Sequence, residues 1–383
     1  MKTDNGALII FIDSFPFYNL NRTEYLNSFP IRYKVTPGFG YSINIQAEIF
    51  SGKSPDKLGY FCQWGYSPSG SDFKKWGPLF QVINPVRNFY YLDRLAHRVI
   101  GKFTGNIGNI PFSYLPSMKK VSADVFEKGF QSQCLFTDFP SIKLISFREF
   151  SHLPVHERDR GVFEKTLQSI PDHQYIVATL VDLDGLAHQN GIDSPIYQKR
   201  LTELDEWIYS LSEPFFKKNP QGTIVVVSDH GIAPVRSGVN LELEKKFGKP
   251  SPKKYFYFVD ATILRIWGFD DMLVKEMESF LKDTQAGSLL TDEERKAFGL
   301  TDPSLATLIF QLNEQLMFSP SFWGRGRSHA MHGYHPELES QKGVCLVLQR
   351  EKISGEPSST LSEIRTTKVY QILYNVLKEA HTC

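Results

Sequence analysis

Short apolar runs, rich in β-branched residues, recur at wide intervals along the chain and alternate with segments of helical periodicity. The clearest runs are ALIIFI at 7–12, YIVATLV at 175–181, TIVVV at 223–227 and VCLVL at 344–348. Each run is apolar at successive positions, so both faces of the strand that it predicts would be buried. Strands of this kind, separated by helices, are typical of an α/β fold with a central, largely parallel sheet flanked by helices.

The most regular helical segment lies between the second and third of these runs. Ser194 is suited to the N-cap position, and Pro195 is suited to the first turn that follows it. Apolar side chains then recur along one stripe of the helix, at Leu201, Leu204, Trp207, Ile208 and Leu211. A last helix is predicted over about 360–380.

Two segments interrupt the alternation of strands and helices. Residues 60–120 are dense in Gly, Pro, Ser and aromatic side chains, which predicts a long ordered excursion from the core. Residues 236–328 contain a lysine-rich turn, a strand-like run and a helical segment, and we interpret them as an inserted cap lobe. The α/β core then consists of residues 1–235 and 329–383.

Charge and cysteine usage exclude several functional classes. The 383 residues carry 43 Lys and Arg against 42 Asp and Glu, which gives a formal net charge of +1. We therefore expect neither a nucleic-acid polymer nor an acidic membrane as a partner, because both attract proteins with a surplus of basic residues. The four cysteines lie far apart without a CxxC pair, and they indicate neither a disulfide framework nor a Cys-based zinc site.

Nothing in the sequence predicts a membrane span, because no run reaches about 18 apolar residues. The apolar run at 7–12 is short, has one basic residue before it and continues into Asp13 without a small-residue cleavage site. We interpret it as the first buried strand of a cytoplasmic protein.

Carboxylates and imidazoles follow three of the predicted strands. Asp13 comes directly after the first strand, Asp184 and His188 follow the second, and Asp229 and His230 follow the third. The carboxyl ends of strands in an open α/β sheet form the rim at which ligands bind. Asp and His suit zinc or a similar divalent ion. An Asp after a strand is more often a helix N-cap, so each Asp alone is a weak indication of a metal site. The joint pattern is a strong indication.

A hydroxyl residue lies at a position that could complete such a site. The segment 38–52 is typical of a glycine-bearing turn that leads into a short helix, with Ser42 at its start. Ser42 is by default an ordinary N-cap. Near a divalent ion, its hydroxyl becomes a candidate nucleophile.

Taken in order, these motifs resemble the alkaline phosphatase superfamily and, within it, the type I phosphodiesterase/nucleotide pyrophosphatase branch. They run from Asp13 to a late His332-Gly333-Tyr334 motif and so extend over nearly the whole chain. The resemblance implies an alkaline-phosphatase-like α/β fold and two divalent metal ions, most readily Zn²⁺, with Mn²⁺ as an alternative. It implies these ligands: Asp13, Asp229, His230 and the nucleophile Ser42 for one ion, and Asp184, His188 and His332 for the other.

Three positions depart from the pattern of that branch. Ser42 replaces the usual Thr and has no proline after it, Gln63 occupies the place of an Asn that binds a phosphoryl oxygen, and Ala187 replaces a Gly. Serine is also the usual nucleophile of the phosphomonoesterase branches. Both monoesters and diesters therefore stay open as substrates.

The resemblance implies a metal-dependent phosphodiesterase that hydrolyses a phosphodiester or pyrophosphate bond through a phospho-seryl intermediate on Ser42, with Gln63 assisting. The expected substrate is a small-molecule phosphate ester, such as a nucleotide or a nucleotide-sugar. One alternative is a phosphomonoesterase or phosphotransferase of the same superfamily. Another is a metal-binding pseudo-enzyme that recognises a phosphorylated ligand. Candidate substrate-binding residues are Asn44, Trp64, Arg325 and Arg327, although the aromatic rings of the excursion could instead only pack it together.

Overall fold

A computed structural model describes most of the chain and divides it into two compact units. The described residues are 5–83, 85, 90–121, 124–127, 129–349 and 362–382. The first unit comprises Met1–Ser54, Ala123–Pro234 and Ser328–Cys383, and the second comprises Pro55–Ser122 and Val235–Arg327.

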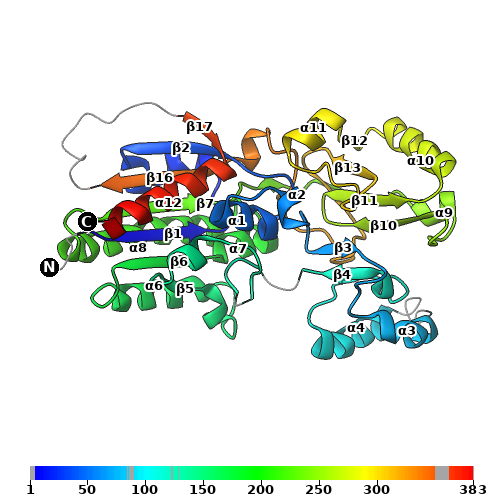
Figure 1. Ribbon diagram of the computed structural model, residues 1–383, viewed down its shortest axis with the longest axis horizontal. Helices are drawn as coiled ribbons and strands as arrows, with labels where there is room; N and C mark the ends of the chain where they lie inside the picture. The colour runs from blue at the N-terminus through cyan, green and yellow to red at the C-terminus, as the bar shows by residue number, and fades with distance from the viewer. Residues whose placement is uncertain are drawn as a thin grey trace. The chain divides into compact units, whose positions relative to one another are not determined.

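The first unit contains a seven-stranded, mostly parallel sheet, which confirms the predicted α/β fold (Figure 1). Strand order is β17-β2-β16-β7-β1-β6-β5. All neighbouring pairs are parallel except those of β16, which runs antiparallel to both β7 and β2. The strands are β1 (Ala7–Ile12), β2 (Ile31–Thr36), β5 (Lys143–Ile145), β6 (Tyr175–Leu180), β7 (Thr223–Ser228), β16 (Gly343–Gln349) and β17 (Ser362–Arg365).

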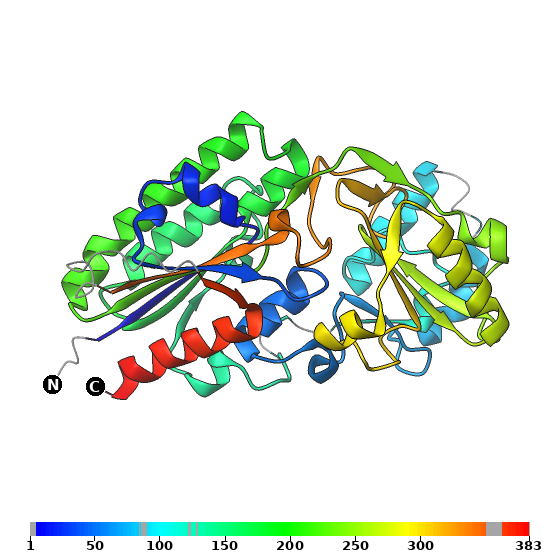
Figure 2. The same ribbon diagram turned by 90° about the horizontal axis from the view of Figure 1, so that it is seen from above.

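Helices cover both faces of this sheet, as its doubly apolar strands require. Alternate residues of β1 enter two separate hydrophobic cores: Leu8 packs with the apolar stripe of α8, and Ile9 packs with α1 and α12. Figure 2 shows the red α12 on one side of the sheet and the green α8 on the other. The helices of this unit are α1 (Ser42–Ser51), α5 (Leu135–Asp138), α6 (Arg158–Ser169), α7 (Asp182–Asn190), α8 (Pro195–Lys218) and α12 (Thr366–Thr382).

Helix α8 confirms the predicted start signal. The Ser194 hydroxyl accepts a hydrogen bond from the backbone N–H of Tyr197, and Pro195 is the first helical residue. The predicted stripe is buried except for Trp207, whose ring stacks on Phe163 with centroids 5.4 Å apart.

The second unit is built around an antiparallel sheet of order β10-β11-β13-β12. Residues 60–120, predicted as an excursion of the core, belong to this unit, because their aromatic side chains pack on its sheet. The Tyr66 ring lies 5.0 Å from that of Phe256, and the Tyr114 ring lies 4.6 Å from the same ring. The sheet strands are β10 (Tyr255–Val259), β11 (Ile263–Gly268), β12 (Gly287–Leu289) and β13 (Leu308–Leu312).

Shorter elements complete the two units. The helices of the second unit are α2 (Pro55–Leu58), α3 (Gly77–Ile83), α4 (Tyr90–Thr104), α9 (Leu243–Phe247), α10 (Asp271–Asp283) and α11 (Asp292–Ala297). Its paired short strands are β3 (Trp64–Tyr66) with β4 (Met118–Lys120), and β9 (Ser237–Val239) with β14 (Leu316–Phe318); in the first unit β8 (Ala233–Pro234) pairs with β15 (Ala330–Met331).

A buried carboxyl group ties α1 to α12. Glu48 accepts hydrogen bonds from the Thr366 hydroxyl at 2.7 Å and the Asn44 amide at 3.1 Å. Gly38 leaves room for this carboxyl, because a Cβ there would lie 2.3 Å from its oxygens. Burial raises the pKa of Glu48 to about 7, although both hydrogen bonds act in the opposite direction.

This shift makes stability fall as pH rises. Below pH 4.5, the ordinary value for Glu, the carboxyl is protonated in both the folded and the unfolded chain. Between that value and about 7 the unfolded chain loses the proton while the folded chain keeps it, which weakens folding by about 3 kcal/mol in total. Glu48→Gln should therefore reduce the loss of unfolding free energy between about pH 5 and about pH 8, measured by urea unfolding. The exposed control Glu206→Gln should leave the wild-type pH dependence unchanged, and equal slopes for Glu48→Gln and wild type would contradict the assignment.

Candidate metal centre

The register of three parallel strands brings the predicted carboxylates to one edge of the sheet. Ile12 at the end of β1 lies opposite Leu180 of β6 and Ser228 of β7. Asp13 therefore leaves β1 at the same level at which Asp229 leaves β7. The Asp13 backbone N–H continues the β1–β6 ladder by donating to Leu180 O at 2.8 Å.

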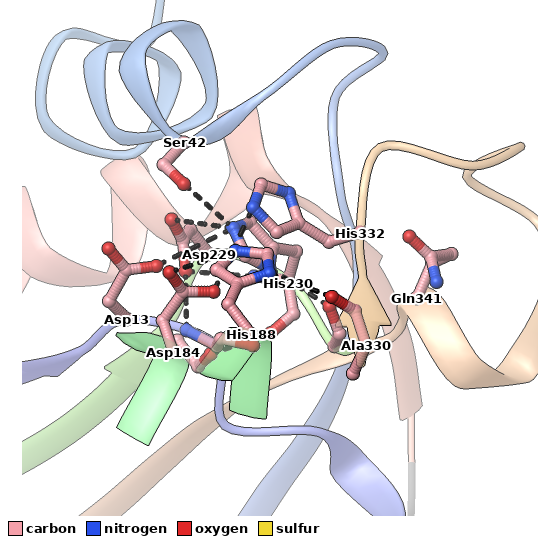
Figure 3. A network of polar contacts seen from close by, with 12 residues as sticks. Asp13, Ser42, Asp184, His188, Asp229, His230, Ala330, His332 and Gln341 are labelled. Carbon is pink, nitrogen blue, oxygen red and sulfur yellow. Dashed lines mark hydrogen bonds and ion pairs between the residues drawn. The ribbon is translucent and has the colours of Figure 1, made fainter. Parts of the chain in front are cut away.

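The first ligand group consists of Asp13, Asp229 and His230, whose ligand atoms lie within 4.8 Å of one another. His230 Nε2 lies 3.5 Å from Asp13 Oδ1 and 3.4 Å from Asp229 Oδ2. The Ser42 hydroxyl lies 2.9 Å from the same nitrogen (Figure 3). Ser42 is the first residue of α1 and Tyr41 occupies the N-cap position, so the hydroxyl of Ser42 is directed to this group.

The second ligand group consists of Asp184, His188 and His332, again with ligand atoms within 4.8 Å. Asp184 and His188 lie one turn apart on α7, and their Oδ2 and Nε2 atoms are 3.2 Å apart. His332 Nε2 lies 3.8 Å from Asp184 Oδ1. The two groups adjoin, because the rings of His230 and His332 stack with centroids 3.9 Å apart (Figure 3).

Backbone carbonyls orient two of the imidazoles. His188 Nδ1 bonds to Ala330 O at 2.8 Å, and His230 Nδ1 bonds to Gly231 O at 2.9 Å. Each contact turns Nε2 toward the carboxylates of its own group. Metal-binding histidines are held in this way in many proteins, because the outer hydrogen bond fixes both the tautomer and the ring direction.

The buried charges of both groups fit divalent cations. Asp13 Oδ1 and Asp184 Oδ1 are buried and have no hydrogen-bond partner among the described residues. Burial and the nearby Asp229 and Asp184 raise the pKa of Asp13 well above its usual range. Burial lowers the pKa of His188, but Asp184 outweighs it and raises that pKa to about 9. A cation would thus replace a proton at the second group and neutralise carboxylates that repel one another.

Comparison with known protein families gives one match to part of the chain. Residues 92–263, which include four of the six Asp and His residues, match the sequence profile of the type I phosphodiesterase / nucleotide pyrophosphatase family. The match over this part of the chain confirms the resemblance seen in the sequence. This is a family of phosphoric ester hydrolases, and its members typically bind two metal ions.

Solved structures of this family show the same fold. Human ectonucleotide pyrophosphatase/phosphodiesterase 5 is 12% identical to the chain with a TM-score of 0.64, and the murine protein is 12% identical with a TM-score of 0.65. An inactive threonine-to-alanine variant of the murine protein, in complex with AMP, has a TM-score of 0.64 at 12% identity. Each comparison covers 98% of this chain and 95% of the other. No match was found among curated protein sequences.

The remaining predicted residue of the first unit, Asn44, has a structural role. Asn44 is buried, and its amide donates to Phe39 O and to Glu48, while its oxygen accepts from the Tyr41 backbone N–H. These contacts hold the turn that presents Ser42.

Four predicted residues belong to the second unit and are described by their contacts there. Gln63 is partly exposed, and Trp64 is fully buried. Arg325 pairs with the buried Asp93 at 2.7 Å, and Arg327 donates to a backbone carbonyl of the same unit. The structure therefore brings Ser42 together with the six Asp and His residues of the first unit.

A second pair of buried carboxylates supports the candidate metal centre and was not predicted. Asp159 accepts hydrogen bonds from two backbone N–H groups at the start of α7, at 2.7 and 3.0 Å. Asp182 accepts in turn from the backbone N–H of Asp159 at 3.1 Å and from Arg200 at 2.7 Å. These contacts fix the start of the helix that carries Asp184 and His188. One sequence signal was present, because Arg200 lies beside the buried apolar stripe of α8.

Asp159→Asn should weaken metal binding at the second ligand group by about tenfold or more, because the start of α7 loses one of the two carboxyl oxygens that accept its backbone N–H groups. Zn²⁺ titration against a competing chelator measures both affinities, and the first group should keep its own. Asp205→Asn is a matched control, since Asp205 accepts backbone N–H groups of residues 24–26 and has no described contact with α7. Unchanged affinity in Asp159→Asn, or an equal loss in the control, would argue against this role.

Proposed function

We propose that the protein is a metal-dependent phosphodiesterase that hydrolyses a phosphodiester or pyrophosphate bond in a small-molecule phosphate ester. The observation that carries the proposal is the position of Ser42 Oγ, 2.9 Å from His230 Nε2 and beside two adjoining ligand groups. A hydroxyl in such a place is suited to attack phosphorus.

Seven side chains would hold two divalent cations, with Zn²⁺ as the best fit and Mn²⁺ as an alternative. When bound, the cations supply Lewis-acid stabilisation for the charge on the attacking and leaving oxygens. The ligands would be Asp13, Ser42, Asp229 and His230 for the first ion, and Asp184, His188 and His332 for the second.

The reaction would take place in two displacements at phosphorus. The Ser42 hydroxyl gives up its proton as its oxygen bonds to phosphorus, the bond to the leaving oxygen breaks, and that oxygen takes up a proton. This step gives a phospho-seryl intermediate and releases an alcohol or a phosphate. Water then attacks phosphorus, the bond to the Ser42 oxygen breaks, one proton of the water regenerates the hydroxyl, and the second phosphate product is released. Ser42 begins α1, a helix of 10 residues whose first backbone N–H groups can bind phosphoryl oxygens. Gln63 would donate a further hydrogen bond to these oxygens.

A nucleotide is the substrate class that we favour. The AMP complex of the murine relative supports this choice, since AMP is a phosphate ester of a nucleoside. Trp64, Arg325 and Arg327 remain candidates for contacts beyond the phosphate.

Ser42→Ala should reduce the hydrolysis of bis-nitrophenyl phosphate by about a thousandfold or more while bound metal is retained, because the nucleophile is lost and most ligands remain. Ser51→Ala is the matched control: Ser51 is a buried serine of the same helix, and its hydroxyl donates to Ala47 O at 2.6 Å and accepts from the Lys53 backbone N–H at 3.3 Å. Full activity of Ser42→Ala would refute the assignment of the nucleophile.

Parallel assays separate the alternatives. Faster turnover of nitrophenyl phosphate than of bis-nitrophenyl phosphate would indicate a phosphomonoesterase or phosphotransferase. Metal binding without turnover of either ester would indicate a pseudo-enzyme.

A further inference from the structure

Helix α4 of the second unit carries polar residues on its inner side. Asp93 is 1% exposed and pairs with His97 at 3.2 Å and with Arg325 at 2.7 Å. The other ring nitrogen of His97 bonds to Ile110 O at 2.9 Å. An amphipathic helix on a protein core usually buries apolar residues, and here the anchoring contacts are hydrogen bonds and ion pairs.

The outer side of α4 is apolar. Leu92, Leu95, Val99 and Phe103 recur at the spacing of one helical face, and all four are exposed. Phe103 is 85% exposed and Leu95 is 57% exposed. Large apolar side chains are common singly on surfaces, but a continuous row along a helix marks an interaction site. We call these four residues the outer row.

Helix α3, in the same unit, adds exposed apolar side chains close by. Both helices pack on one ring: Phe80 of α3 lies 6.1 Å and His97 of α4 lies 4.2 Å from Phe112. Figure 1 shows the two helices side by side. The exposed apolar side chains that precede or belong to α3 are Trp76, Leu79 and Val82.

Basic side chains accompany the outer row. Arg94, Arg98 and Lys102 are exposed and follow one another at four-residue intervals along α4. The one acidic residue of the helix, Asp93, is buried. The net charge of +1 for the whole chain therefore conceals a helix whose exposed charged residues are all basic.

We propose that the outer row and its basic side chains bind an anionic phospholipid surface. A helix with this pattern lies in the plane of the interface, with apolar side chains at the acyl boundary and Lys and Arg at the phosphates. Charge favours this partner over a second copy of the chain, because a symmetric contact would place a second basic row near the first. No described helix is long and apolar enough to cross a bilayer, so binding is peripheral.

Vesicle sedimentation of the full chain tests the proposal. The protein should bind vesicles that contain phosphatidylserine in phosphatidylcholine, bind weakly to phosphatidylcholine alone, and dissociate at high salt. Arg98→Glu with Lys102→Glu should reduce binding about tenfold or more, and so should Leu95→Ser with Phe103→Ser. The matched control is Met272→Ser with Lys275→Glu, exposed positions on α10 of the same unit, and it should bind like wild type.

Circular dichroism checks that each variant is folded, since all four substituted positions of α4 are exposed. Absence of binding to both vesicles would overturn the proposal, as would binding that none of the α4 variants weakens. A concentration-dependent dimer in sedimentation velocity, lost in Leu95→Ser with Phe103→Ser, would assign the row to self-association and would also overturn it.

Discussion

The parallel register of β1 between β6 and β7 is the constraint on which the candidate site depends. Ile12, Leu180 and Ser228 end their strands at one level. Asp13 and Asp229 follow directly, and Asp184 follows four residues after Leu180, in the first turn of α7. A slip of one residue would turn the apolar side chains of β1 to the wrong faces, so the two hydrophobic cores hold this register in place. The same packing that stabilises the sheet thus positions Asp13 against Asp229.

Concentrating carboxylates at that edge opposes folding. Burial raises the pKa of both Asp13 and Asp229, because each loses water and gains like-charged neighbours. Buried unpaired charge is tolerated mainly where function requires it. Burial also raises the pKa of Asp159 and Asp182, but Arg200 and backbone N–H groups donate hydrogen bonds to this pair, and of its four oxygens only Asp182 Oδ1 has no partner among the described residues. A cation would neutralise the first cluster, and the second cluster supports the start of α7.

Several elements of the fold could be predicted from the sequence, because the local pattern of apolar and capping residues determines them. The apolar runs locate four strands, and Ser194 locates the start of α8. The antiparallel direction of β16 could not be predicted, since a strand buried on both faces has the same apolar pattern in either direction. The unit to which residues 60–120 belong depends on aromatic partners far away in sequence, such as Phe256.

The candidate site, too, could be predicted only in part from the sequence. The spacing of Asp184 and His188 predicts that they share one metal site. Asp159 could not be predicted, because it contacts the start of their helix only through the packing of α6 against β6. Ser42 could be placed at a helix start, but its hydroxyl direction depends on Tyr41 taking the N-cap position. The outer row of α4 was not predicted, because the composition of residues 60–120 indicated an excursion without locating this helix.

Anomalous diffraction at the zinc edge, from crystals grown with Zn²⁺, tests the central claim most directly. The account predicts two adjoining anomalous peaks in the first unit. One should lie among Asp13, Ser42, Asp229 and His230, and the other among Asp184, His188 and His332. The account would be contradicted by the absence of peaks at these residues, or by zinc bound only elsewhere on the protein.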